Sequence, residues 1–322
     1  MPFARLSSKR KYLYRNMNKI LITLEREMMK DERQILLDNL HALFPTLRRE
    51  QWTVERTAEG LTNHLYHCAA TDGTKCMYRV YGVNTDRLID RKKELTLLRC
   101  LGEQGLLARV LGCFPDALVY EFVEGRTLQT HESPSYQAEI AKRLAQFHNQ
   151  ATIAMSSTIT NEKELVYNTL IRKWHDLLPE DIRHEYPLVQ VQADHNGPIV
   201  FCHNDLLPAN IILTPTQDVK FIDFEYAGWN PAAYDIANHL CEDITLSAEP
   251  SKLPNPKRIH DFVSVYNQHA DQKVRPEDVQ KYLPFVNLLW SIWARIQALS
   301  SHIDFDYVSY SQKRLQMYKS AL

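Results

Sequence analysis

One stretch near the middle of the chain constrains the fold most, because it places polar residues at both ends of a short apolar hairpin. These polar residues are His203, Asp205, Asn210 and Asp223. Between the last two, residues 211–222 form an apolar run, a Thr-Pro-Thr-Gln-Asp segment and a second apolar run, the pattern of two strands joined by a turn. A hairpin brings its ends together, so Asn210 and Asp223 are predicted to face one another across its mouth.

The order and spacing of these residues match the H-x-D-x-x-x-x-N loop and the following D-F pair of kinases, although the template's arginine and final glycine are absent. Phosphoryl transfer depends mainly on positioning and on neutralisation of charge. Asp205 is predicted to be the base that accepts the proton of an attacking alcohol. Asn210 and Asp223 offer the hard oxygen ligands that Mg²⁺ prefers, and His203 is predicted to support the loop structurally.

A kinase also needs a cation on the nucleotide phosphates and an acid that holds this cation. Arg79 lies in a predicted strand, residues 76–81, and Glu94 lies in the helical segment 90–101 that follows. Arginine supplies a fixed charge and a bidentate fork, although an arginine on an edge strand is more often simply solvated. No G-x-G-x-x-G loop precedes this strand and no A-P-E segment follows Asp223, so the sequence favours a small-molecule substrate.

Length and the pattern along the chain predict two lobes. A chain of 322 residues exceeds the size at which one hydrophobic core stops growing, roughly 250 to 300 residues. Short β-like runs, at residues 65–69, 76–81 and 117–122, are followed by mainly helical patterns, which indicates an α+β, bilobal, protein-kinase-like fold. The predicted parts are a basic extension with a leading helix (1–50), a β-rich nucleotide-binding lobe (51–122), a hinge (123–126) and a mainly helical catalytic and substrate lobe (127–322).

Charge and composition exclude several classes of protein. The formal net charge is −1 and the pI is about 6.9, so the basic field needed to bind nucleic acid is missing. The six cysteines show no C-x-x-C spacing, which predicts free thiols in a reducing, cytoplasmic location. The apolar stretch 285–294 is far shorter than the ~20 residues that a membrane span requires. The basic tract at the start of the chain resembles a transit peptide but lacks an apolar signal core, which favours a solvated extension.

Several segments resemble the choline and ethanolamine kinases. The strongest likeness lies in the catalytic loop, the D-F region and the Tyr-Asp-Ile-Ala-Asn-His segment at 234–239. Other segments resemble the family's nucleotide loop, phosphate-side strand, hinge and aromatic helix, at residues 61–63, 79–82, 120–122 and 289–293. The resemblance covers the chain from about residue 50 to the end.

The resemblance implies ATP and Mg²⁺ as cofactors and an amino alcohol as the second substrate. By its motifs, Asp205 is again the base and Asn210 and Asp223 are again the metal ligands. The residues implied to hold ATP are Arg79, Glu94, Thr62, Asn63 and Glu121. The residues implied to line the pocket for the substrate's ammonium group are Glu242, Tyr226, Trp290 and Trp293. Asp235 is expected to anchor the backbone of the catalytic loop and to take no part in the chemistry.

Ethanolamine is favoured over choline, although segments of the chain point in both directions. Glu242 is followed by Asp-Ile-Thr-Leu-Ser, without the aromatic residues that choline kinases usually carry there, which favours a head group rich in hydrogen-bond donors. Residues 79–94 and 204–207 also resemble the ethanolamine enzymes, whereas residues 238–242 resemble the choline enzymes.

Three alternatives stay open. Choline could be the main substrate, a kinase acting on aminoglycosides or sugars would share the catalytic residues, and an inactive kinase-fold scaffold would keep the fold to bind a metabolite or partner. Trp290, Trp293 and Glu242 argue against the second alternative, and the presence of every chemically necessary residue argues against the third. The expected partners are ATP and the amino alcohol, without nucleic acid or an integral membrane segment, and a homodimer is left open.

Overall fold

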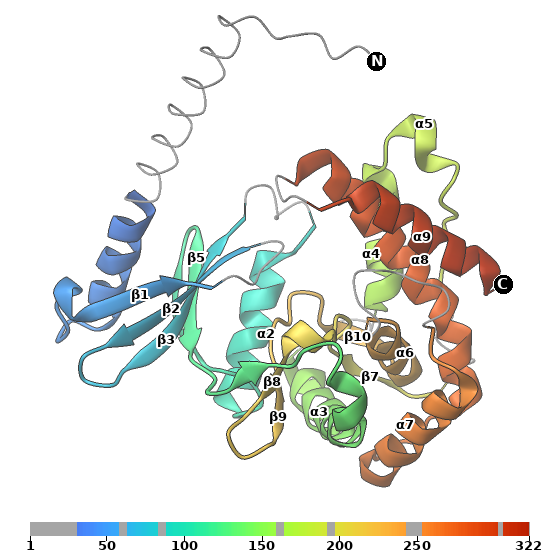
Figure 1. Cartoon of the computed structure of the whole chain (residues 1–322), viewed down its shortest axis with the longest axis horizontal. Helices are drawn as coiled ribbons and strands as arrows, with labels where there is room; N and C mark the ends of the chain where they lie inside the picture. Colours follow the sequence, from blue (N-terminus) through green and yellow to red (C-terminus); the bar gives the residue numbers. More distant parts are fainter. Residues whose placement is uncertain are drawn as a thin grey trace, which may run out of the picture.

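The chain forms a small lobe built on one sheet and a larger, mainly helical lobe (Figure 1). The computed structural model describes residues 31–57, 63–82, 88–158, 164–191, 197–242, 253–301 and 305–321. Figure 1 shows α2 (Arg91–Glu103) between the sheet and the helices of the large lobe. The predicted bilobal α+β architecture is therefore confirmed.

The small lobe contains a five-stranded antiparallel sheet in the order β1-β2-β3-β5-β4. The strands are β1 (Trp52–Arg56), β2 (Asn63–Ala70), β3 (Lys75–Tyr81), β4 (Val110–Phe114) and β5 (Ala117–Glu121). The sequence predicted the three inner strands and missed β1 and β4. Both missed strands lie at the edges and expose most of their residues at least partly, so they lack the apolar run that marks an inner strand.

The two faces of this sheet have different roles. One face packs against the leading helix, which is described over residues 31–43, through Leu36, Leu37, Leu40, Trp52, Tyr66, Cys76 and Tyr78. Because side chains alternate along a strand, Arg79 points to the opposite face, toward α2. Arg79 lies in a central strand, between Leu65 of β2 and Leu118 of β5, and is not on an edge.

The hinge between the lobes is short. Residues 122–125 connect β5 to β6 (Arg126–Thr127), which pairs with β8, so the predicted hinge 123–126 overlaps this strand at its last residue. Gly125 has a φ of 144°, and a Cβ atom there would lie 2.5 Å from the carbonyl oxygen of Leu213. Only glycine therefore fits this turn without a shift of the backbone.

The large lobe surrounds the catalytic segment with helices. Its helices are α3 (Gln137–Thr158), α4 (Val166–Leu177), α5 (Glu180–Arg183), α6 (Ala232–Glu242), α7 (Pro256–His269), α8 (Pro276–Ser300) and α9 (Tyr307–Ser320). Two antiparallel pairs carry the site, namely β7 (Ile199–Cys202) with β10 (Gly228–Pro231), and β8 (Ile211–Leu213) with β9 (Val219–Phe221). The β8–β9 pair is the hairpin predicted from the sequence. In the part of the chain that the structure describes, no helix has the length and apolar character needed to cross a membrane.

Candidate active site

The catalytic loop runs from His203 to Asn210, between β7 and β8, and Asp235 of α6 holds its first residues. The Asp235 carboxylate accepts hydrogen bonds from the backbone N–H groups of His203, at 2.8 Å, and Asn204, at 2.7 Å. Asn204 has a φ of 66°, an uncommon conformation that these bonds help to fix. The contacts are those expected of an anchor for the loop.

A side chain from α3 also holds Asp235. Nε2 of His148, on α3, lies 2.9 Å from Oδ2 of Asp235, and Nδ1 of His148 lies 2.7 Å from the hydroxyl of Tyr266. Burial alone would raise the pKa of Asp235, but the bond to His148 and the loop N–H groups outweigh it and leave the pKa lowered. Asp235 is therefore an ionised, fully buried anchor. Nothing in the spacing of the sequence indicated His148.

His203 connects the catalytic loop to the segment that carries Asp223. Its Nε2 lies 2.9 Å from the carbonyl oxygen of Ile222, and its Nδ1 accepts a bond of 3.3 Å from the N–H of Asp205. Burial lowers the pKa of His203, so the ring is neutral with its proton on Nε2. This geometry supports the structural role predicted for His203.

Asp205 lies in a strongly negative environment. Nδ2 of Asn210 donates to its backbone oxygen, at 2.8 Å, and to its Oδ2, at 3.3 Å. Burial raises the pKa of Asp205 well above its usual range, and the charges of Asp223, Glu242 and Glu225 raise it further. Acids of the predicted metal site and the acid of the predicted amine site therefore both act on this carboxylate.

The mouth of the hairpin brings Asn210 and Asp223 together, as its pattern predicted. The N–H of Ile222 donates to the carbonyl oxygen of Asn210 at 3.0 Å, which places Asp223 next to this pair. Because the Asn210 amide nitrogen points to Asp205, its Oδ1 makes no hydrogen bond among the described residues and is free to act as a ligand.

Three carboxylates, Glu94, Asp223 and Glu225, form a compact acidic cluster. One oxygen atom from each lies within 4.8 Å of the others. Burial and then the charge of Asp223 raise the pKa of Glu225 to about 8, and Arg79 and Arg91 only partly reverse this shift. Hard oxygens with surplus negative charge are the setting that a divalent cation such as Mg²⁺ fits. Glu225 stands where the kinase template has a glycine, and no role was predicted for it from the sequence.

Arg79 and Glu94 form a buried ion pair, with side chains only 5% and 2% exposed. The second terminal nitrogen of Arg79 lies 3.5 Å from Oδ1 of Asp223. Arg79 thus extends from the sheet to the edge of the acidic cluster, where nucleotide phosphates would lie. The predicted pairing of these two residues is present in the structure.

Arg91, at the start of α2, adds a second cation that the sequence analysis missed. It donates to Oε2 of Glu94 at 2.9 Å and to Oδ1 of Asn63 at 3.0 Å, and its guanidinium lies 4.4 Å from the ring centre of Tyr81. Nδ2 of Asn63 is 3.4 Å from Oε2 of Glu225. Asn63 therefore lies at the acidic cluster, whereas Thr62 is outside the described residues.

The side chain of Glu121 does not face the acidic cluster. Its carboxylate accepts bonds from the Arg109 side chain, with Nε at 2.7 Å, and from the Arg109 N–H at 3.1 Å. Tyr120, one residue earlier, lines a small cavity with Arg79 and Asp223, and alternation along β5 turns Glu121 the other way. The predicted contact of Glu121 with ATP stays a prediction.

Tyr226, Trp290 and Trp293 form an aromatic cluster close to the catalytic loop. The ring centres of Tyr226 and Trp290 are 5.5 Å apart, and those of Trp290 and Trp293 are 5.8 Å apart, both nearly perpendicular. The indole N–H of Trp290 donates to Asn238 at 2.8 Å, which fixes this ring. The structure thus brings together the three aromatic residues named from the sequence, and Trp174 and Tyr307 extend the cluster.

Glu242, at the end of α6, is paired with a buried arginine. Arg314 of α9 forms an ion pair with Glu242 and donates to Asn287 at 2.9 Å and to the Tyr310 hydroxyl at 3.0 Å. Burial raises the pKa of Glu242, and Arg314 partly reverses this effect. The carboxylate predicted to attract an ammonium group therefore already has a cationic neighbour.

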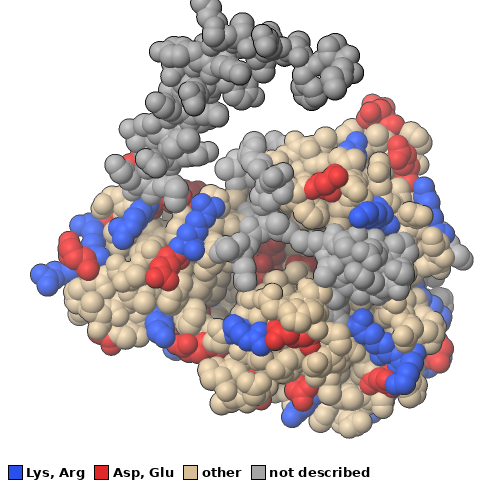
Figure 2. Space-filling view, in the orientation of Figure 1, with Lys and Arg blue, Asp and Glu red and all other residues tan. Residues whose placement is uncertain are grey.

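The surface between the lobes is hollowed, and acidic side chains lie at the floor of the hollow (Figure 2). On the rest of this face, basic and acidic side chains are interspersed. A cationic or metal-bound ligand fits such a floor better than a free anion does.

The sequence matches the family described as choline/ethanolamine kinase over residues 54–319. This chain belongs to the choline/ethanolamine kinase family. Among its relatives, the probable ethanolamine kinase A of Dictyostelium discoideum is 32% identical over 84% of this chain and 85% of that protein. The probable choline kinase 2 of Arabidopsis thaliana is 30% identical over 76% of this chain and 77% of that protein. The resemblance seen in the sequence is thereby confirmed.

Solved structures of the choline/ethanolamine kinase family share the fold. The Plasmodium vivax ethanolamine kinase superposes with a TM-score of 0.68 at 22% identity, over 85% of each chain. The Cryptosporidium parvum choline kinase superposes with a TM-score of 0.73 at 20% identity, over 89% of this chain and 94% of that one. These structural similarities support the bilobal fold and do not identify the substrate.

Proposed function

We propose that this member of the choline/ethanolamine kinase family transfers the γ-phosphoryl group of ATP to the hydroxyl group of ethanolamine, with Mg²⁺ as the metal. The observation that carries the proposal is the position of Asp205. The charges of Asp223 and Glu225 in the acidic cluster and the charge of Glu242 all act on it, and its own charge acts on Tyr226 of the aromatic cluster. A base in this position can reach a hydroxyl group located between a phosphate and an ammonium group.

Each residue of the site has a separate role in phosphoryl transfer. Asp205 accepts the proton of the hydroxyl group as this oxygen attacks the γ-phosphorus. Arg79, held by Glu94, contacts the phosphates and stabilises the charge that develops on them. Asn210 and Asp223, with Glu225 beside them, would hold Mg²⁺, which neutralises phosphate charge when it is bound.

The amine side fits a primary ammonium group. Such a group has three donors, and the Glu242 carboxylate and the Tyr226 hydroxyl can accept hydrogen bonds from it. Burial and then the charge of Glu225 raise the pKa of Tyr226, so this hydroxyl stays protonated. The aromatic cluster would also attract a quaternary ammonium group by cation–π contact, so choline is expected as a weaker second substrate. The six cysteines are free, which supports a reducing, cytoplasmic location.

A substrate series tests the preference for ethanolamine. With purified protein, ATP and Mg²⁺, kcat/KM should fall stepwise from ethanolamine through its mono- and dimethyl derivatives to choline. The total decrease should be about tenfold or more, because each methyl group removes a donor, and hydrogen bonds to charged groups are worth ~1.5–3 kcal/mol. A kcat/KM for choline that equals or exceeds the value for ethanolamine would overturn the preference, but the phosphotransferase activity would stand.

Replacing Glu242 by glutamine should raise KM for ethanolamine about 10- to 100-fold and leave KM for ATP unchanged, because one charge-assisted contact is lost. Arg314 would lose its partner in this variant, so packing could also be disturbed. The matched control is the double variant Glu242→Gln, Arg314→Gln, which removes both charges. If the double variant regains a normal KM, Glu242 acts only through Arg314 and is not a substrate ligand.

A further inference from the structure

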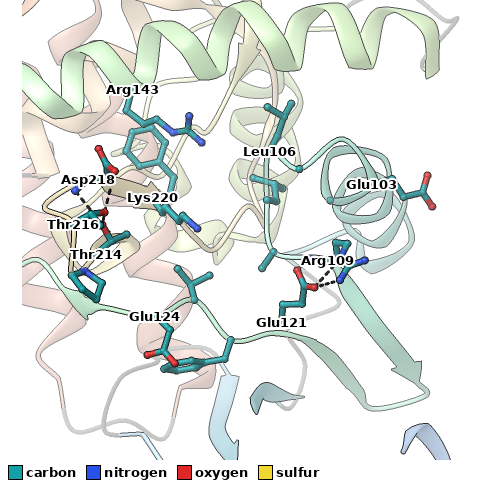
Figure 3. A pocket seen from close by; sticks show the side chains of 18 residues that line it. Glu103, Leu106, Arg109, Glu121, Glu124, Arg143, Thr214, Thr216, Asp218 and Lys220 are labelled. Carbon is teal, nitrogen blue, oxygen red and sulfur yellow. Dashed lines mark hydrogen bonds and ion pairs between the residues drawn. The ribbon is translucent and has the colours of Figure 1, made fainter. Parts of the chain in front are cut away.

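A second pocket lies on the other side of the hinge from the acidic cluster (Figure 3). Its volume is about 690 Å³, which falls in the size range of small-molecule sites. Residues 102–109 of the small lobe form one wall, the hinge contributes Glu121–Glu124 as a second, and Arg143 with residues 214–221 of the large lobe completes it. The catalytic loop and Asp223 do not line this pocket.

Two cations face this pocket without an ion-pair partner. Figure 3 shows Arg143 extending from α3 and Lys220 extending from β9 into the same space. No carboxylate of the described residues lies within ion-pair distance of either one. Arg109, the third basic residue of the lining, differs because Glu121 already holds it.

Besides Glu121, the lining contains three acids, of which Glu103 points away from Arg143 and Lys220 (Figure 3). Glu124 is paired with Lys75, and Asp218 accepts a hydrogen bond of 3.1 Å from the Thr216 hydroxyl. The charge of Asp218 raises the pKa of Arg143 but only partly offsets the effect of burial. A half-buried guanidinium that lacks an ion pair is costly, and burial lowers the pKa of Arg143 accordingly. An anion in the pocket would remove this cost.

The remaining walls indicate what the anion is attached to. The pocket is much larger than a bare phosphate ion, and part of its lining is apolar, namely Leu106, Leu107, Ala108, Phe122 and Val123. A guanidinium fork next to an ammonium group suits the oxygens of a phosphate monoester. The apolar wall opposite suits an organic body.

We infer that the pocket behind the hinge binds a small phosphate monoester, with Arg143 on the phosphate, Lys220 beside it and the apolar wall on the organic part. Because its walls come from both lobes, an occupant connects the lobes and changes how they close on ATP. The site is therefore regulatory in kind, and KM for ATP should change when it is filled. Neither the catalytic loop nor the aromatic cluster takes part in it.

Pyridoxal 5′-phosphate is a suitable probe, since it is a phosphate monoester with an aldehyde that condenses with a lysine amine. Borohydride reduces the imine to a stable secondary amine, and mass spectrometry then locates the label. With a non-hydrolysable ATP analogue and Mg²⁺ present, Lys220 should be labelled at about tenfold lower concentrations of pyridoxal phosphate than of pyridoxal, which lacks the phosphate. Inorganic phosphate should compete with this labelling.

Three variants separate the site from general lysine reactivity. Arg143→Gln should abolish the preference for the phosphorylated probe at Lys220, and Arg143→Lys should restore most of it. Arg99→Gln removes an exposed cation outside the pocket and should change nothing, while labelling of the exposed Lys142 reports ordinary surface reactivity. Equal labelling of Lys220 by both probes, or a preference that survives in Arg143→Gln, would overturn the inference.

Discussion

Replacing Asp223 by alanine is expected to abolish turnover, lowering kcat by at least about 10³-fold while the fold persists. Asp223 belongs to the acidic cluster and lies at the hairpin mouth beside Asn210. Without it, Asn210 and Glu225 offer too few oxygens for the ion, so a higher concentration of Mg²⁺ should rescue little activity. Steady-state kinetics over a range of Mg²⁺ concentrations, with circular dichroism to check folding, would measure this.

The matched control for this variant is Asp116→Ala. Asp116 is an exposed acid in the turn between β4 and β5, so the substitution removes the same group outside the acidic cluster. It should leave kcat and the Mg²⁺ dependence unchanged. Full activity of Asp223→Ala, or equal losses in both variants, would contradict the assignment of Asp223 as a metal ligand.

The part of the site that the sequence predicted is the part that local spacing determines. The catalytic loop and hairpin occupy one continuous segment, and strand pairing between Ile211 and Phe221 fixes the distance between its polar ends. The geometry of such a segment is determined by its own local sequence. The positions of Asn210 and Asp223 could therefore be inferred without knowledge of the rest of the fold.

Two of the missed residues, Arg314 and His148, have partners that lie far away in the sequence. Arg314 meets Glu242 across 72 positions, and His148 meets Asp235 across 87. Burial forces these contacts, because an ionised group in a low-dielectric core needs a partner from whichever element is nearest. Only the packing of α3, α6 and α9 shows which element lies nearest, and this packing cannot be read from a single sequence.

The direction of the Glu121 side chain could not be predicted, for a different reason. The strand that contains it was predicted from the sequence, but a family motif gives a position and not the direction of a side chain. Pairing of β5 with β3 and β4 decides that direction, and the β4 strand was itself missed. The carboxylate consequently faces Arg109 and the second pocket.

Asp205→Asn should lower turnover by about 10² to 10⁴, the usual contribution of a positioned base, and should preserve folding and ATP binding. Asparagine has nearly the same shape, and its side-chain oxygen can still accept the bond from Asn210 Nδ2. Removing one charge also relieves repulsion from Asp223, so the affinity for ATP with Mg²⁺ should stay the same or rise.

Kinetics and direct binding together decide the role of Asp205. For Asp205→Asn, kcat for ethanolamine should fall while the dissociation constant for ATP, measured by calorimetry with Mg²⁺, does not increase. A loss of ATP binding would instead mean that Asp205 serves the metal, which is the result expected for Asp223→Ala. The exposed-acid variant Asp116→Asn controls for loss of charge in general. Near-normal turnover of Asp205→Asn would remove Asp205 from the base role, because a positioned base typically contributes about 10²- to 10⁴-fold.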